Sequence, residues 1–286
     1  MKFSIIVRTY NRKKIILRSL KSLLRQTYQN YEILIIDDHS NDGTKSYVNK
    51  IINDKRIKYF YLKKNIGHIK ASEYGLNKSK GDVVCFLDSD DIWHKKFLSY
   101  HFKTYAKCQD IQCVYNNTMT VLNGKKIRPY YSNIDGNCYK DALKKLYLSS
   151  QIALSFKRSC WKKLKTLDYG MSREDDDLCL RLSKLYKFKH IDKDLSLANL
   201  ENRSQITSNI LNHAKSYKKL FLKYKKDIYL YCSKKEISNH YYLISKKFYL
   251  AQSFSESKKN IIKALKKYPS VKNLFFFVLV LLRMQK

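Results

Sequence analysis

The chain has 286 residues, enough for one domain of about 200 residues with a smaller piece, or for two modest domains. Its 58 Lys and Arg against 24 Asp and Glu give a net charge of +34, which indicates a polyanionic partner, either nucleic acid or an anionic lipid surface. The sequence has no apolar run near the ~20 residues needed to span a bilayer, no signal-peptide pattern at its start, and seven scattered Cys without a CxxC pair. We therefore expect a cytoplasmic protein with reduced thiols.

The first part of the chain alternates short apolar runs with amphipathic stretches. The pattern predicts strands at 3–7, 31–36, 57–62 and 82–87, with helices at 13–25, 42–52 and 69–77 between them. This alternation indicates an α/β fold with a mainly parallel sheet flanked by helices. In such sheets ligands bind outside the carboxyl ends of the strands.

The rest of the chain is less regular and then becomes helical. We expect short strands and helices over 110–170, with Gly124 suited to a hairpin, and a helix at Glu174–Tyr186 with a very acidic first turn. From about residue 206 the pattern predicts helices rich in Lys and Tyr. The prediction is thus a catalytic-type domain at 1–207 and a basic helical region at 208–286.

Asp88-Ser89-Asp90 follows the fourth predicted strand. Two carboxylates two residues apart on a turn can hold one hard divalent cation, which would bridge the two phosphates of a nucleotide diphosphate. The alternative is an acidic turn in which Asp91 caps the next helix. The position at a strand end favours the metal–diphosphate site.

Asp37-Asp38 ends the second predicted strand. A carboxylate at this place can accept hydrogen bonds from a nucleotide base or from ribose hydroxyls. The surrounding Asp-Asp-His-Ser-Asn-Asp-Gly stretch is also rich in turn-forming residues. Both interpretations stay open.

Glu174-Asp175 begins the long acidic helix. One carboxylate there can act as a general base that removes the proton of an attacking hydroxyl. Acidic residues also stabilise a helix N-terminus directly. Spacing alone does not separate the two roles.

The ordered motifs resemble the family 2 glycosyltransferases of the GT-A fold. The resemblance covers roughly residues 3–207 and rests on five segments, at 4–12, 35–44, 65–67, 81–91 and 174–182. It implies inverting transfer of a sugar from a nucleotide-diphosphate donor, with uridine diphosphate as the commonest nucleotide and Mg²⁺ or Mn²⁺ as the cofactor.

The resemblance also implies roles for particular residues. Asp175 would be the catalytic base, Glu174 would orient the acceptor, and Asp90 would bind the metal. The donor would be held by Thr9, Tyr10, Arg12, Asp37, Asp38, Asn65, Gly67, Lys70, Asp88 and Ser89.

The sequence departs from the family pattern at three places. The family commonly has Pro where Arg8 stands. It often has Ala-Arg-Asn where this chain has Ala71-Ser72-Glu73, so an Arg that can steady the diphosphate is absent, and Lys70 or Lys63 would replace it. Many members carry a His metal ligand where this chain has Glu201, which can ligate Mg²⁺ or Mn²⁺ through oxygen or instead pair with Arg203.

The C-terminal region carries repeated Lys pairs among Tyr and Leu, and it includes the apolar run Leu274–Leu282. It is interpreted either as a solvated helical domain with a packed core helix, or as an arm that binds the anionic inner face of the cytoplasmic membrane. Transfer to a glycan or lipid-linked oligosaccharide in surface polysaccharide synthesis fits the second interpretation. The alternatives are a basic nucleic-acid-binding protein, which acidic strand ends disfavour, and a glycan-binding relative without activity.

Overall fold

The computed structural model describes residues 1–284 except 52, 123–124, 128–132, 169–172 and 200–208. The chain divides into two compact units. The first comprises Met1–Cys138, Ser149–Tyr169 and Arg181–Asn202, and the second comprises Tyr139–Leu148, Gly170–Leu180 and Arg203–Lys286. Helix α7 (Glu174–Leu185) contributes residues to both units. Each unit is described by itself.

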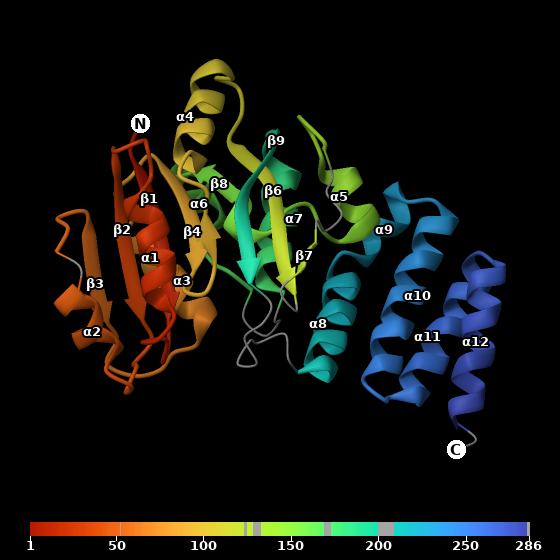
Figure 1. The fold of residues 1–286 in the computed structure, drawn as a ribbon. Helices are drawn as coiled ribbons and strands as arrows, with labels where there is room; N and C mark the ends of the chain where they lie inside the picture. Colours follow the sequence, from red (N-terminus) through yellow and green to blue (C-terminus); the bar gives the residue numbers. More distant parts are fainter. Residues whose placement is uncertain (52, 123–124, 128–132, 169–172, 200–208, 285–286) are drawn as a thin grey trace. The chain divides into compact units, whose positions relative to one another are not determined.

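The first unit is built on one sheet, whose described strands follow the order β3-β2-β1-β4-β8-β6-β9-β5, with β7 paired to β6 (Figure 1). Strands β1 to β4 are mutually parallel, and β8 joins β4 in the antiparallel sense. The sheet is therefore mixed but parallel where β1 to β4 lie, as predicted. The strands are β1 (Phe3–Thr9), β2 (Tyr31–Asp37), β3 (Ile57–Tyr61), β4 (Val83–Asp88), β5 (Ile92–Trp93), β6 (Cys113–Leu122), β7 (Lys125–Ile127), β8 (Leu154–Lys157) and β9 (Phe188–Asn199).

Helices connect these strands close to the predicted places. The apolar stripe predicted over 13–25 forms a helix at Ile16–Leu24, and the other predicted helices begin and end within two residues of their expected bounds. Besides the last part of α7, the described helices of this unit are α1 (Ile16–Leu24), α2 (Thr44–Ile51), α3 (His68–Lys78), α4 (Phe97–Lys107) and α6 (Arg158–Leu164), with a short 3₁₀ turn η1 (Gln151–Ala153).

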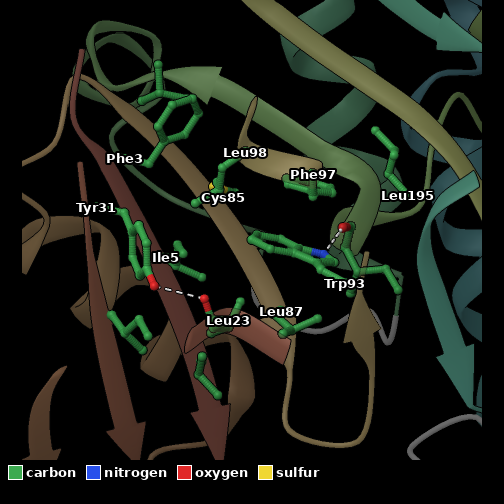
Figure 2. Close-up of a cluster of buried hydrophobic side chains, with 14 of the residues drawn as sticks. Phe3, Ile5, Leu23, Tyr31, Cys85, Leu87, Trp93, Phe97, Leu98 and Leu195 are labelled. Carbon is green, nitrogen blue, oxygen red and sulfur yellow. Dashed lines mark hydrogen bonds between the residues drawn. The ribbon is translucent and has the colours of Figure 1, made fainter. Parts of the chain in front are cut away.

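The core of the first unit lies on both faces of β1 and β2, whose residues are almost all buried. On one face Phe3 and Ile5 pack with Leu23 of α1 and with Trp93 and Phe97 (Figure 2). The Trp93 and Phe97 rings are stacked 3.7 Å apart, and the Trp93 indole donates to the Ile152 carbonyl at 2.7 Å. On the other face α3 approaches closely through Gly75, where an added Cβ would lie 2.6 Å from Ile6.

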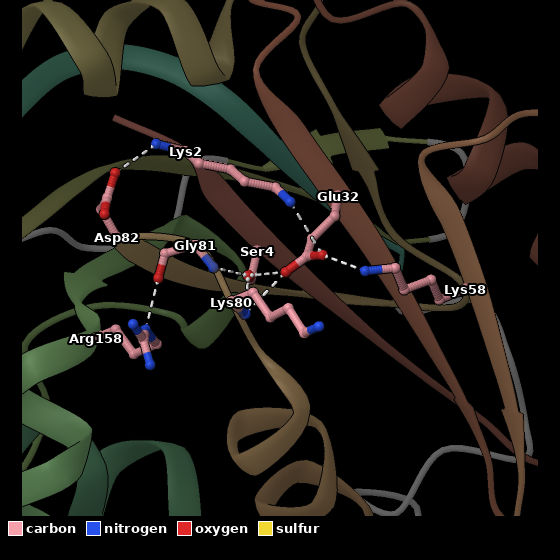
Figure 3. Close-up of polar contacts among 8 residues, drawn as sticks. All are labelled: Lys2, Ser4, Glu32, Lys58, Lys80, Gly81, Asp82 and Arg158. Atoms are coloured by element: carbon pink, nitrogen blue, oxygen red, sulfur yellow. Dashed lines mark hydrogen bonds and ion pairs between the residues drawn. The ribbon is translucent and has the colours of Figure 1, made fainter.

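A polar cluster closes the amino-terminal edge of the parallel strands (Figure 3). The Glu32 carboxylate accepts hydrogen bonds from the Ser4 hydroxyl at 2.7 Å, the Lys58 ammonium at 2.8 Å, the Lys80 backbone N–H at 2.8 Å and the Lys2 ammonium at 3.2 Å. Gly81 passes so close to β1 that a Cβ would lie 2.7 Å from the Lys2 carbonyl oxygen. Burial alone would raise the pKa of Glu32, but these bonds outweigh it and lower the pKa to about 2.

The second unit is helical. A capping box starts α10, where Ser233 and Glu236 exchange hydrogen bonds with each other's backbone N–H. Phe221, His240 and Tyr241 form an aromatic cluster inside the unit. Besides the first part of α7, its described helices are α5 (Tyr139–Lys145), α8 (Ile210–Lys223), α9 (Lys225–Tyr231), α10 (Lys234–Leu250), α11 (Phe254–Lys267) and α12 (Val271–Met284).

The predicted fold class is confirmed: an α/β unit with a mainly parallel sheet, plus a helical C-terminal region. The predicted boundary between residues 207 and 208 stays a prediction, because residues 200–208 lie outside the described part. Among the described helices, none combines the length and the apolar character that crossing a bilayer requires.

Candidate functional site

The carboxyl ends of β1, β2 and β4 bring most of the predicted site residues together. In the parallel register Thr9 lies beside Asp37, and Arg8 lies beside Asp88. The loops that follow these strands carry the remaining polar groups. The edge expected to bind a ligand is thus assembled from segments separated by up to 80 residues in the sequence.

The last residue of β1, Thr9, carries a buried hydroxyl at the carboxyl edge of the sheet. Thr9 is 4% exposed, and its Oγ1 has no hydrogen-bond partner among the described residues. Its carbonyl accepts from the Asp38 N–H at 2.9 Å, which joins the β1 and β2 loops. Tyr10 is 48% exposed, and Asn11 follows in a left-handed conformation with φ of 52°. A polar atom left unsatisfied in this way indicates a ligand or solvent site.

Asp37 and Asp38 are both buried and already bonded to protein. Asp37 accepts from the Ser40 N–H at 2.7 Å and from the Tyr59 hydroxyl. Asp38 accepts from the N–H groups of Ile66 and Gly67 at 2.7 and 2.8 Å. These carboxylates therefore hold the loops at the strand ends, and each oxygen keeps a second lone pair for a further donor.

The segment before α3 depends on Gly67, which has a φ of +84° that a side chain would strain. The Asn65 side chain accepts from the Gly67 N–H at 3.2 Å. Asn65 and Lys70 are exposed. The segment from 65 to 67 is thus fixed by hydrogen bonds from two directions, while the Lys70 side chain reaches the surface.

The Asp88–Asp91 turn gathers acidic side chains among arginines. The Arg8 guanidinium donates to Asp88 Oδ1 at 2.5 Å, and the Arg12 guanidinium lies 3.8 Å from Asp90 Oδ2. Arg18 donates to the Asp90 carbonyl at 2.7 Å. The Asp88 side chain is 39% exposed, whereas Ser89, Asp90 and Asp91 are buried.

Asp91 is buried within this acidic turn. Burial raises the pKa of its carboxyl, and the Asp88 and Asp90 charges raise it further. The Asn199 N–H donates to Asp91 Oδ1 at 2.9 Å. Asp91 thus ties the acidic turn to β9 instead of capping a helix that begins next to it, since α4 starts only at Phe97.

The donor set of the turn is chemically suited to Mg²⁺ or Mn²⁺, since Asp88 and Asp90 supply two hard carboxylates. Within the described ranges, no three side chains of His, Cys, Asp or Glu gather in a metal-binding arrangement. The third predicted ligand, Glu201, lies outside the described residues. The remaining ligand positions would then fall to donor phosphates and water.

Glu174 and Asp175 begin α7 and belong to the second unit. Glu174 is buried and Asp175 is partly exposed. The Asp175 carboxylate accepts from the Asp176 N–H at 2.9 Å, and Asp176 pairs with Arg173 at 2.5 Å. Asp177 is held by the Tyr224 hydroxyl at 2.8 Å and Lys223 at 2.6 Å. In this acidic run, then, Asp176 and Asp177 serve the packing of the helix while Asp175 reaches solvent.

Sequence reasoning missed two residues of the first unit. Arg8 was noted only as a departure from a family pattern, and Gln151 was not singled out. The signal for Arg8 was its position in a buried strand, because a buried guanidinium requires an acidic or polar partner. Gln151 carries no sequence signal, since only the fold brings it to Arg8.

Comparisons with known proteins agree with this geometry. Residues 4–157, more than half of the chain, match the model of the family "Glycosyl transferase family 2". An uncharacterized glycosyltransferase of Haemophilus influenzae is 44% identical over 150 residues, which is 48% of this chain and 58% of that protein. A UDP-Glc:alpha-D-GlcNAc-diphosphoundecaprenol beta-1,3-glucosyltransferase of Escherichia coli is 34% identical over 142 residues, 47% of this chain and 55% of that protein.

The chain therefore spans less than two thirds of either relative. In fold it is similar to the mannosyltransferase PcManGT of Pyrobaculum calidifontis, solved with GDP-Man and Mn²⁺. The TM-score is 0.64 and the identity 16%, over 97% of this chain and 78% of that one. The extent of the family match decides the assignment: the chain belongs to glycosyl transferase family 2.

Proposed function

We propose that this protein transfers a sugar, with inversion, from a nucleotide-diphosphate donor to a glycan or lipid-linked acceptor in surface polysaccharide synthesis. The observation that carries the proposal is the convergence of two features on one edge of the parallel strands: the Asp88–Asp90 turn and the buried Thr9 hydroxyl, which has no partner in the described part of the chain. The UDP-sugar donor rests on the activity named for the Escherichia coli relative.

The donor would lie along this edge. Thr9, Tyr10, Asp37 and Asp38 would bind the base and ribose, because they lie at the carboxyl ends of two adjacent strands. Asn65, Gly67 and Lys70 would line the same side. Asp88 and Ser89 would face the ribose and diphosphate, with Arg12 beside them. Asp90 would hold Mg²⁺ or Mn²⁺, with Glu201 as a further ligand; the ion would neutralise charge on the departing diphosphate.

Asp175 is proposed as the catalytic base, with Glu174 orienting the acceptor. The acceptor hydroxyl oxygen forms a bond to the anomeric carbon while the bond from that carbon to the diphosphate oxygen breaks. The hydroxyl proton passes to the Asp175 carboxylate, and the nucleoside diphosphate leaves with the bonding electron pair. The partial exposure of Asp175 supports this role, because the base must reach a bound acceptor.

The test is turnover of a nucleotide-sugar panel with Mn²⁺, followed by mass spectrometry. We expect Asp175→Asn to lower kcat by about 10²–10⁴-fold while nucleotide affinity stays within about twofold. Asp110→Asn is the matched control, because Asp110 pairs with Lys187 on the surface. Full turnover by Asp175→Asn would refute the role of Asp175 as the catalytic base. Salt-dependent DNA or RNA binding without nucleotide-sugar turnover would favour the nucleic-acid alternative.

We also propose that α12 attaches the protein to the anionic inner face of the cytoplasmic membrane. Five apolar side chains of this helix are exposed on one stripe: Val271 (87%), Leu274 (57%), Phe275 (65%), Val278 (46%) and Leu282 (55%). Its other side is packed, with Phe276 against the rings of Tyr242 and Tyr249. Residues 208–286 hold 18 Lys and Arg against three acids, so an anionic bilayer fits both the charge and the stripe.

Flotation with liposomes tests the attachment. We expect binding to vesicles with anionic phosphatidylglycerol, weak binding to neutral phosphatidylcholine, and loss of binding in Phe275→Asp. Leu230→Asp is the control, because Leu230 is 71% exposed but lies on α9. Equal binding of the wild type and Phe275→Asp, or concentration-dependent dimerisation that Phe275→Asp abolishes, would show that the stripe has another occupant.

A further inference from the structure

The Arg8 guanidinium joins four elements of the first unit. From β1 it donates to Asp88 of β4 at 2.5 Å, to the Ser72 hydroxyl of α3 at 3.0 Å and to Gln151 Oε1 of η1 at 2.9 Å. The guanidinium also lies 5.9 Å from the Phe86 ring centroid. With a side-chain exposure of 12%, Arg8 is largely enclosed, whereas its partner Asp88 is 39% exposed. The positive charge is thus fixed in contact with a more accessible carboxylate.

A second observation at the same place is a buried donor of Gln151 that a ligand could satisfy. Gln151 is 4% exposed, and its Nε2 has no hydrogen-bond partner among the described residues. Because Arg8 can only donate, the amide oxygen of Gln151 must face Arg8, which leaves the amide nitrogen as the unsatisfied donor. A buried donor of this kind costs free energy unless a bound group accepts from it.

The charges of the turn agree with this interpretation. Asp88, Asp90 and Asp91 stand within four residues, and without compensation they would repel a diphosphate. Arg8, Arg12 and Arg18 provide three compensating cations, of which Arg8 is held by the Asp88 carboxylate itself. A guanidinium offers a planar set of donors that matches phosphate oxygens.

We propose that Arg8, together with Gln151, binds the diphosphate of the donor, an inference that rests on the proposed function. The two departures from the family pattern at positions 8 and 72 then meet in space, because Arg8 Nη1 and Ser72 Oγ are 3.0 Å apart. Arg8 on β1 thus supplies the positive charge that Ser72 on α3 does not carry. Lys70 and Lys63, the replacements expected from the sequence, are exposed side chains.

Calorimetry with a ligand series tests this role. UDP, UMP and uridine are titrated in Mn²⁺, with GDP, GMP and guanosine in parallel. We expect Arg8→Ala to weaken binding of the nucleoside diphosphate by at least about tenfold, and binding of the nucleoside by less than about twofold. Arg8→Lys keeps the charge but loses the planar set of donors, so its affinity for the diphosphate should lie between those of the wild type and Arg8→Ala. Arg56→Ala is the control, because Arg56 pairs with Asp54 in the loop before β3.

A charge swap supplies the decisive comparison. In Arg8→Ala with Ser72→Arg, the guanidinium reaches the same place from α3, into the space that Arg8 leaves. Partial recovery of diphosphate affinity supports the proposal, and a folded double variant without recovery overturns it. If Arg8→Ala weakens the binding of nucleoside diphosphate and of nucleoside equally, Arg8 has a purely structural role and the proposal is overturned. If the wild type binds neither nucleoside diphosphate, the proposed function fails instead, which keeps the two failures distinguishable.

Discussion

The two edges of the parallel strands hold their carboxylates in opposite ways. At the amino-terminal edge one buried carboxylate, Glu32, accepts from four donors, two of which are lysine ammonium groups (Figure 3). At the carboxyl edge Asp88, Asp90 and Asp91 crowd one turn, and their mutual repulsion adds to burial in raising the pKa of Asp91. We expect the first arrangement to stabilise the fold, and the second to be stabilised further when a cationic or donor ligand binds.

The largest effect should come from the carboxyl edge. We expect Asp90→Asn to lower sugar transfer by about 10²-fold or more, because a metal ligand is lost. Its free energy of unfolding should stay unchanged or rise by up to about 1 kcal/mol, because one repelling charge is removed. Paired kinetics and urea unfolding measure both quantities.

Asp135→Asn is the control for that experiment, since Asp135 pairs with Lys189 away from the turn. If Asp90→Asn were strongly destabilised but kept normal turnover per folded molecule, the carboxyl edge would serve stability and not catalysis, contrary to our expectation.

The next effect belongs to the amino-terminal edge. We expect Gly81→Ala to destabilise the protein by roughly 2–3 kcal/mol, because the new Cβ meets backbone atoms that no side-chain movement can relieve. Urea unfolding gives the value. Gly136→Ala cannot serve as the control, because Gly136 has a φ of 76° that a side chain would strain. The control is Ala71→Ser, a small change at a buried position of α3. A loss below about 0.5 kcal/mol would mean that β1 and β4 are not held at this spacing.

Glu32→Gln should destabilise the protein by about 2 kcal/mol at pH 7, because charge-assisted bonds from two lysines are weakened. The sign of the pH dependence follows from the lowered pKa. Glu32 contributes stability above its ordinary pKa near 4.5, and this contribution is lost as pH falls through about 2.

Unfolding free energies between pH 7 and pH 2 measure this dependence. The wild type should lose more stability than Glu32→Gln over this acid range. Parallel curves for the two proteins would contradict the assigned shift, and unchanged turnover per folded molecule would sharpen the contrast with the carboxyl edge.

The smallest effect is expected from Ser4→Ala, at about 1 kcal/mol. The Ser4 hydroxyl donates to Glu32 and accepts from the Gly81 N–H at 2.8 Å. Because Glu32 keeps its other three donors, the carboxylate stays ionised in this variant. A double-mutant cycle with Glu32→Gln measures the coupling, and additivity of the two changes would show that the cluster does not act as a unit.

The sequence by itself determined the order and type of the elements from β1 to β4, the acidic helix α7 and the helical character of the C-terminal region. Apolar runs of strand length, a helical stripe such as Ile16, Leu20 and Leu23, and turn residues at the strand ends are local patterns set by backbone periodicity. The position of Asp88 and Asp90 at a strand end followed from the same patterns, because parallel strands end at one edge.

Only the tertiary structure decided what each of these groups contacts. The partners of Arg8 lie 64, 80 and 143 residues away, and the bonds from Ile66 and Gly67 that commit Asp38 to its loop come from 28 and 29 residues away. The charge and type of a residue show that its side chain needs a partner when buried, but they do not identify that partner. That choice depends on long-range packing, which brings strands and loops distant in the sequence within hydrogen-bond reach.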